Sequence, residues 1–249
     1  MRTRSRILRW LGLGLVIALA LVFVLGTWVV PAVIVAEIRQ HHTGYVTITG
    51  WWIHWSSAGV TGLTLHETDS PGSPVWATAE RVTTDLSLRS LLRGRFAPRR
   101  LIFDHPSVSY RLDATGQPLT TIPLQHAGGG PIPELIVRDG QLAMRQADRP
   151  EMLISHLKAR MVSEPDGPRF EAQADDPRWG NPQIAGQFSA DFSSVALRLA
   201  AERLVADPDT WARIPFVDRS VWKHFQPHGP LGVVVDFAQK LDPPGPSEV

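Results

Sequence analysis

The segments LIFDHPSVSYR (residues 101–111) and LIVRDGQLAMR (residues 135–145) decide the fold, because they are two copies of one pattern offset by 34 positions. Leucine, isoleucine and arginine coincide in register, and apolar residues recur at other equivalent positions. His105-Pro106 and Asp139-Gly140 interrupt the copies at the same place, so each copy predicts two short strands. A repeated strand pair that cannot bury its own apolar face implies an elongated sheet built from similar units.

Alternation within these segments assigns side chains to the two faces of the predicted sheet, because successive side chains of a strand point to opposite sides. A later segment, residues 195–199, alternates in the same way. The apolar side chains expected on one face are Val108, Tyr110, Leu112, Leu142, Met144, Val195, Leu197 and Leu199. The polar side chains expected on the other face are Ser109, Arg111, Gln141 and Arg145.

The rest of the chain beyond residue 40 also reads as β-rich, with glycine and proline at short intervals. Residues 45–49, 63–65 and 86–88 alternate and predict further strands. We expect an antiparallel meander, because parallel strands need crossovers of a dozen or more residues, usually helical. Only two short helices are predicted, one at residues 88–93 and one at 208–212.

The first predicted helix carries three leucines on one face, and five arginines surround it. We interpret these arginines as a solvated surface around a connection between strands, with attraction to anionic lipid headgroups as the alternative. They are Arg89, Arg93, Arg95, Arg99 and Arg100.

Residues 10–36 contain no charged side chain and predict a membrane anchor. Residues 10–30 alone would form about 31 Å of helix, which matches a hydrocarbon core of about 30 Å. Trp10 and Trp28 are placed to act as interfacial anchors. Four arginines precede the span, which predicts a cytoplasmic N-terminus. The span exceeds the apolar stretch of a cleaved signal peptide, so we expect a retained, single-pass anchor.

The composition excludes several classes of protein. A chain of 249 residues with 43% apolar residues can bury a core, which excludes disorder. It has no cysteine, which excludes disulfides and thiol chemistry. Without the four N-terminal arginines, 21 basic residues face 24 acidic ones, a balance that does not fit a nucleic-acid-binding protein.

The order of motifs after the anchor resembles the N-terminal region of AsmA-like proteins, the group that includes TamB. The motifs are TDLSLRSLLRGR at residues 84–95, then residues 101–111, then DATGQPL at 113–119. AsmA-like proteins similarly have a strand that leads into a short Leu-Leu-x-Gly helix, a strand with a P-x-V step, and a G-x-x-L turn. The resemblance covers residues 5–145, and family members are commonly longer than this chain.

The resemblance implies an extended, curved β-sheet whose apolar side chains line a groove for phospholipid. The implied role is non-catalytic: handling or transport of phospholipid, or support of outer-membrane assembly, with envelope assembly proteins as further partners. It places the chain in the inner membrane, with residues 1–9 in the cytoplasm and 10–36 in the bilayer. Residues 37–241 would form the periplasmic domain, and 242–249 a proline-rich tail or truncated linker. The eight apolar residues named above are the candidates for lining the groove.

Two other classes of function stay open at this point. An envelope interaction scaffold, or a glycan-binding module that uses Trp51, Trp52 and Trp55, would have a packed β-sandwich core. A hydrolase would need converging carboxylates, for which residues 175–176 and 207–209 are candidates, although acids in such turns usually cap helices. The chain contains no nucleophile elbow and no P-loop.

The histidines near the anchor match no motif of metal ligands. They are His41, His42, His54 and His66. We therefore expect no catalytic residues, no metal site and no cofactor.

Overall fold

The computed structural model describes residues 32, 35–36, 42–95, 97–120, 133–190, 193–215 and 229–240. The described strands form one sheet of eleven, in the order β1-β3-β4-β5-β6-β7-β8-β9-β10-β11, with β2 also paired to β3. The strands are β1 (Val46–Thr47), β2 (Gly50–Ile53), β3 (Ala58–His66), β4 (Val75–Thr84), β5 (Arg100–Leu112), β6 (Glu134–Gln146), β7 (Met152–Val162), β8 (Arg169–Ala174), β9 (Gln183–Phe188), β10 (Ser194–Ala206) and β11 (Gly229–Lys240). The short helices are α3 (Leu88–Leu92), the 3-10 helix η2 (Pro177–Trp179) and α4 (Pro208–Arg213).

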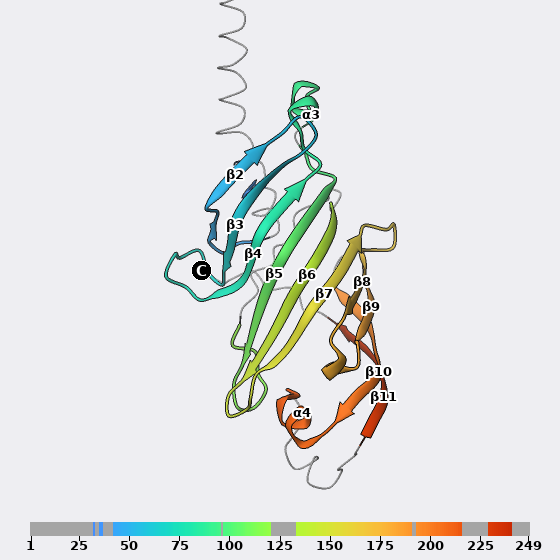
Figure 1. Ribbon diagram of the computed structural model, residues 1–249. Helices are drawn as coiled ribbons and strands as arrows, with labels where there is room; N and C mark the ends of the chain where they lie inside the picture. Colours follow the sequence, from blue (N-terminus) through green and yellow to red (C-terminus); the bar gives the residue numbers. More distant parts are fainter. Residues whose placement is uncertain are drawn as a thin grey trace, which may run out of the picture.

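The mainly β class and the long curved sheet with short helices are confirmed (Figure 1). Both predicted α-helices are present, and α4 starts as expected, with Asp207 as its N-cap and Pro208 in its first turn. The β-sandwich core expected for the alternative function is wrong, because all described strands lie in one sheet rather than two packed sheets. The strand expected at 86–88 is also wrong: Leu86 is fully buried and leads directly into α3.

The repeat forms a parallel pair of strands, which corrects the expectation of an entirely antiparallel sheet. β5 and β6 run side by side in parallel, with Leu101 beside Leu135 and Arg111 beside Arg145. The two copies therefore pair in register with each other. The 21 residues between the strands exceed the dozen or so that a parallel crossover needs. Each copy is one strand of 13 residues rather than two short ones.

A line of backbone kinks crosses β3 to β7, and we call it the crease. The backbone has a positive φ at Gly62, His105, Asp139 and His156. The pairing registers place Gly62 opposite Glu80, Glu80 opposite His105, and His105 beside Asp139. Asp139 and His156 are joined by a hydrogen bond. These five residues on five neighbouring strands define the crease.

Alternation changes phase at the crease. On β4 the side chains of Ala79 and Val82 are both buried, whereas Glu80 and Arg81 between them are both exposed. A strand without a kink would instead send Glu80 and Arg81 to opposite faces. Glycine is required at position 62, where φ is +61° and an added Cβ would lie 2.1 Å from Thr49 Oγ1. The kinks keep the apolar side chains on one face along the whole sheet.

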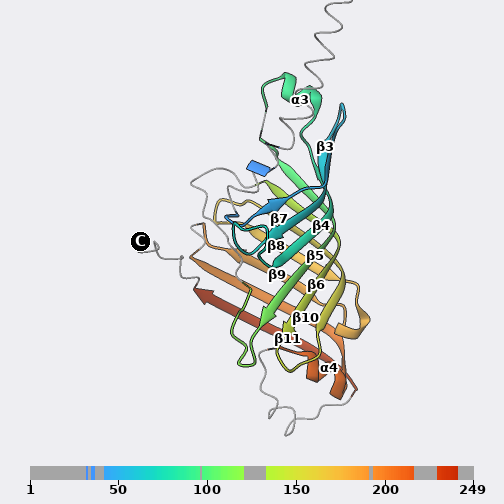
Figure 2. The same ribbon diagram turned by 90° about the vertical axis from the view of Figure 1, so that its left-hand side faces the viewer.

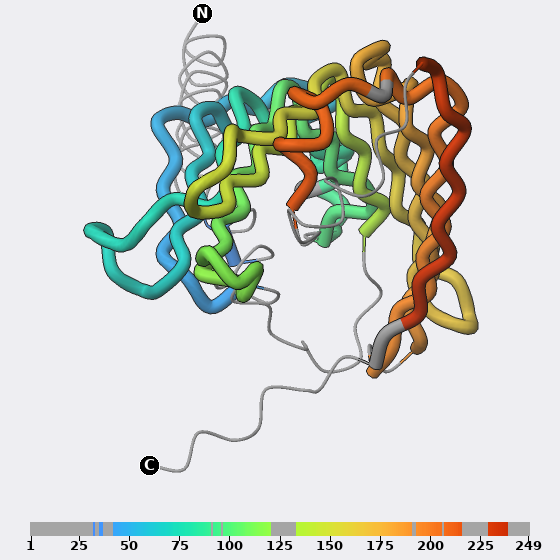
Figure 3. The backbone as a smooth tube through the Cα atoms, turned by 90° about the horizontal axis from the view of Figure 1, so that it is seen from below, coloured from blue at the N-terminus to red at the C-terminus, as the bar shows by residue number. Residues whose placement is uncertain are grey.

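The sheet has a helix at each end. In Figure 2, α3 lies at one end of the sheet and α4 at the other, and we call these the α3 end and the α4 end. Viewed along its length, the sheet curves around an interior, and α4 lies within the curve (Figure 3). One buried cluster includes Val60, Val82, Leu86 and Leu101, near the α3 end. A second includes Ile154, Trp179, Leu204 and Trp211, near the α4 end.

No helix among the described residues is long and apolar enough to cross a membrane. Apart from residues 32 and 35–36, the segment expected to form the anchor lies outside the described residues, and so do Trp10 and Trp28. Residues 1–9 and 242–249 also lie outside them.

Candidate functional site

The structure brings the eight predicted apolar residues onto one face of the sheet. Val108 lies beside Leu142 and Tyr110 beside Met144 on the parallel pair, and paired residues of neighbouring strands point to the same side. Further strands extend this face, since Leu142 pairs with Ile154 on β7. The far side of the sheet contributes Val195, Leu197 and Leu199 on β10, which pair with Phe188, Gly186 and Ile184.

This face is the inside of the curve. Trp211 of α4 packs in the same buried cluster as Ile154 and Leu204, and α4 lies within the curve of the sheet (Figure 3). We call it the inner face. It continues without a break to the edge strand β11, where Val235 and Phe237 pair with Leu199 and Leu197. Apolar side chains thus line the inside of the sheet from β3 to β11.

Exposure differs along the inner face. Leu112 is 2% exposed and Val195 is 8% exposed, so the protein itself covers both of these predicted groove residues. The other six predicted residues are partly buried. At the β11 edge, Val235 and Phe237 are 48% and 47% exposed. A broad apolar surface is therefore accessible, and it is most open towards β11.

The opposite, outer face carries Ser109, Arg111, Gln141 and Arg145, as the alternation predicts, with apolar side chains such as Ala143 among them. Arg111 donates to the buried carboxylate of Glu67 at 2.7 Å. Two open depressions, of about 480 and 580 Å³, lie over β8 to β11, and their linings combine outer-face residues such as Ala196 and Ala238 with inner-face residues such as Val195 and Leu197. The two faces differ in chemistry, and the inner one is suited to contact with an apolar ligand.

Glu134 ties three strands together at the α3 end. Its carboxylate accepts hydrogen bonds from Arg100 Nε on β5 at 2.6 Å and from Arg160 Nε on β7 at 2.7 Å. These two hydrogen bonds are the main cause of the lowered pKa of Glu134, because they favour the charged form.

The crease carries a row of ionisable side chains that the sequence reasoning missed. His105 lies between two carboxylates, with Nδ1 3.2 Å from Glu80 and Nε2 3.3 Å from Asp139. His156 Nδ1 lies 2.7 Å from the other oxygen of Asp139, and this hydrogen bond is the main cause of the lowered pKa of Asp139. The only signal in the sequence was the interruption of both repeats at equivalent positions, residues 105 and 139.

The α4 end is closed by two tryptophans. Trp179 Nε1 donates to the carbonyl of Leu153 at 2.7 Å, and Trp211 is 8% exposed. Two arginines fix the segment around α4 to the turn between β6 and β7: Arg149 donates to the carbonyl of Ile214, and Arg213 to that of Glu151. These contacts end the inner face on this side.

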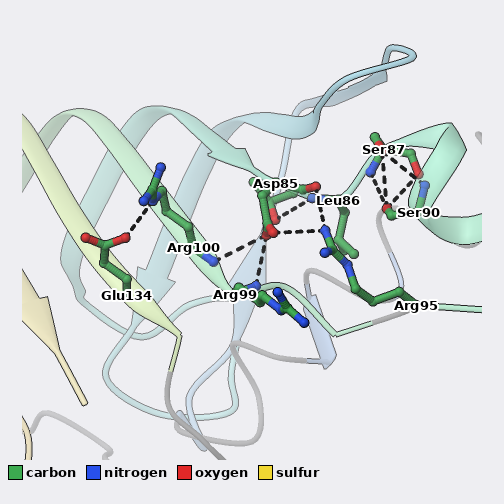
Figure 4. Close-up of polar contacts among 9 residues, drawn as sticks. Asp85, Leu86, Ser87, Ser90, Arg95, Arg99, Arg100 and Glu134 are labelled. Atoms are coloured by element: carbon green, nitrogen blue, oxygen red, sulfur yellow. Dashed lines mark hydrogen bonds and ion pairs between the residues drawn. The ribbon is translucent and has the colours of Figure 1, made fainter. Parts of the chain in front are cut away.

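The α3 end is organised around Asp85 (Figure 4). Its carboxylate accepts hydrogen bonds from the Arg95 guanidinium at 2.9 Å and from the backbone N–H groups of Arg99 and Arg100. Ser87 and Ser90 cap α3 reciprocally, each hydroxyl accepting from the other's backbone N–H (Figure 4).

The predicted carboxylate and histidine candidates lie apart from one another. Asp176 caps η2 and Asp207 caps α4, and the backbone N–H of Thr210 is the main cause of the lowered pKa of Asp207. His66 Nδ1 lies 2.8 Å from the carbonyl of Ser73, and His42 packs edge-on against Trp76. Within the ranges the structure describes, no group of three or more His, Asp or Glu side chains is placed to hold a metal ion.

Comparison of the sequence with known protein families gives no match, and comparison with curated proteins gives no significant match.

Proposed function

We propose that this protein binds phospholipid acyl chains on the inner face of its sheet, as a membrane-anchored, AsmA-like protein with a non-catalytic role in lipid handling or outer-membrane assembly. The observation that carries the proposal is the continuous apolar inner face, from Val108 and Leu142 to Val235 and Phe237. The motifs at residues 84–95, 101–111 and 113–119 support the family resemblance.

The chemistry of an acyl chain fits this surface. Each CH₂ group that leaves water contributes about 0.8 kcal/mol, without any requirement for direction. A row of partly exposed Leu, Val, Met and Phe side chains therefore suffices, and no single residue has to be indispensable. The anchor expected at residues 10–36 would hold the sheet beside the bilayer that supplies the lipid.

The test compares charges placed on the two faces of the same strands. Val108→Asp with Leu142→Asp puts two carboxylates side by side on the inner face, where burying a charge beside acyl chains is costly. Ser109→Asp with Gln141→Asp puts the same charges on the outer face. We expect phospholipid that co-purifies with the full chain, measured by native mass spectrometry, to fall roughly tenfold in the first variant only.

A second measurement does not depend on how well the variants fold. A phospholipid with a photoreactive acyl chain is crosslinked to the unaltered full chain, and the attached peptides are mapped by mass spectrometry. Crosslinks concentrated on inner-face residues such as Leu142 and Phe237 are expected. Crosslinks to outer-face residues, or no retained lipid at all, would exclude the proposed function.

A further inference from the structure

The α3 end exposes apolar side chains beside exposed arginines. Trp55, in the connection between β2 and β3, is 62% exposed, and Leu92, the last residue of α3, is 58% exposed. The two segments are joined directly, since the backbone N–H of Leu88 donates to the carbonyl of His54 at 3.2 Å. Figure 1 shows α3 projecting at this end of the sheet. A tryptophan and a leucine are therefore exposed at the same end of the molecule.

Positive charge surrounds these two side chains. Arg89, Arg93 and Arg99 are exposed, and in the described part of the chain their guanidinium groups make no ion pair. The acidic groups next to α3 are already used, because Asp85 is bound by Arg95 and Glu134 by Arg100 and Arg160. The exposed Glu164 and Asp166 lie at the same end of the sheet but in the connection between β7 and β8. The part of the α3 end formed by α3 itself therefore presents positive charge with apolar residues in it.

The end is also fixed in shape before it meets a ligand. Asp85 holds the segment on the far side of α3 through the backbone of Arg99 and Arg100 (Figure 4). The buried Ser87 and Ser90 cap the start of α3. Because these segments are already ordered, little conformational entropy is lost when Trp55 and Leu92 move from water into a less polar environment.

We propose that the α3 end docks on an anionic phospholipid bilayer, with Trp55 and Leu92 in the interfacial region and Arg89, Arg93 and Arg99 on lipid phosphates. Tryptophan favours this region, and arginines near an anionic surface add attraction. The inference rests on the proposed function in one respect, the expectation that the chain is anchored in a membrane. It adds which end of the sheet faces the lipid.

The length of chain before the sheet allows this orientation. β1 pairs with β3 at Leu65, and the eight residues from Ala58 to Leu65 span roughly 23 Å towards the α3 end. Residues 10–30 alone are long enough to cross the hydrocarbon core, which leaves residues 31–41 to reach the described sheet. With residues 32, 35 and 36 helical, these eleven residues can span at most about 33 Å. The bilayer is thus within reach of Trp55 and Leu92.

The test uses the absence of cysteine from the chain, which makes single-cysteine variants unambiguous. Trp55→Cys and Leu92→Cys are labelled with an environment-sensitive fluorophore in the full chain, reconstituted into phosphatidylcholine–phosphatidylglycerol vesicles that contain a nitroxide lipid. Ala147→Cys, in the exposed turn between β6 and β7 at the α4 end, is the control. We expect the labels at 55 and 92 to be blue-shifted and quenched, and the label at 147 to stay in water.

The contribution of charge is tested with the label at position 92. Arg89→Gln with Arg93→Gln should lower the ratio of docked to undocked protein roughly 25-fold at low salt, at about fivefold for each arginine. Arg178→Gln with Arg203→Gln removes two exposed arginines elsewhere and should leave the ratio unchanged. Added salt should act like the first pair of substitutions.

The outcomes separate this inference from the proposed function. If the labels at 55 and 92 show the same emission and the same lack of quenching as the label at 147, the docking is overturned. Equal quenching in vesicles without phosphatidylglycerol overturns the role of charge. Either result leaves lipid binding on the inner face standing if crosslinks to Leu142 are retained. Docking without any lipid crosslinked to the inner face would instead overturn the proposed function alone.

Discussion

Glu134 connects three strands through one carboxylate, and its protonation is expected to weaken the sheet. Its pKa is lowered in the folded protein from the ordinary value of 4.5. The stabilisation is therefore present above about pH 4.5 and is lost as the pH falls through the lowered pKa. Since Arg100 and Arg160 are more than half exposed, we expect Glu134→Gln to cost about 1 kcal/mol at pH 7.

The measurement is the free energy of unfolding in urea at several pH values. The difference between the unaltered protein and Glu134→Gln should shrink towards zero in acid, below pH 4.5. Glu171→Gln, which removes an exposed carboxylate paired with Arg169 on its own strand, is the control, and we expect a change within about 0.5 kcal/mol. A Glu134→Gln effect that does not vary with pH would show that the charge of Glu134 contributes nothing.

Single residues explain why part of the site escaped prediction. Alternation correctly assigned Val108, Leu142 and Leu197 to one face, because the face depends only on position within a strand. Exposure depends on what packs above a side chain, and this is a tertiary property. The turn after β5 folds back, with the backbone N–H of Leu119 donating to the carbonyl of Arg111, and the neighbouring Leu112 is buried.

At the scale of elements, α4 depends on the N-cap residue that precedes it more than on its length. A helix of six residues is too short to be stable by itself, so its cap and its contact with the sheet must hold it. Asp207 accepts a hydrogen bond from the N–H of Thr210 at 2.7 Å. We expect Asp207→Ala to lower the free energy of unfolding by about 1 kcal/mol and to speed hydrogen exchange in α4.

Asp209→Ala is the matched control, because Asp209 lies in the first turn of the same helix and is exposed. It should change stability by only a few tenths of a kcal/mol, the size of an exposed helix-dipole effect. Equal effects of the two substitutions would mean that the capping hydrogen bond does not stabilise the α4 end.

Local signals predicted these elements well, and long-range pairing was the part they could not predict. Asp207-Pro208 marks a helix start within a few residues of sequence, and the three leucines of α3 share a face by spacing alone. The direction of β6 relative to β5 depends on the path of the 21 residues between them, which alternation does not report. The repeat at an offset of 34 did contain a signal for the strand direction. Two strands with the same order of residues place equivalent residues side by side only when they run in the same direction.

At the scale of the whole molecule, the in–out alternation of side chains shifts by one residue at the crease. The kinks absorb this shift, so the apolar side chains stay on one face on both sides of the crease. Deletion of His105 would remove the kink from β5, which is paired on both sides, with β4 and β6. Pro106, Val108 and Tyr110 would then point outwards, while Ser109 and Arg111 would point inwards. We expect this deletion to cost more than about 4 kcal/mol and to abolish cooperative unfolding.

Deletion of Gly72 controls for the loss of one residue. Gly72 lies in the exposed connection between β3 and β4, and apart from its own chain neighbours no residue has a heavy atom within 4 Å of the place where its Cβ would be. Circular dichroism during thermal unfolding should show a normal transition for this variant and none for the His105 deletion. A normal transition for both variants would mean that β5 can keep its apolar side chains on the inner face without the kink at His105.

The parallel pairing of the repeat with itself has a consequence for how such a sheet can change in size. A unit of 34 residues contains one strand, its kink and the return connection, so copying the unit adds a strand that already matches its neighbour at every position. Gene duplication in whole units would therefore widen the apolar surface while conserving its orientation. Insertions of an odd number of residues within the strands would reverse the faces of their side chains, as the His105 deletion does, which leaves duplication of whole units as the simple route to a wider sheet.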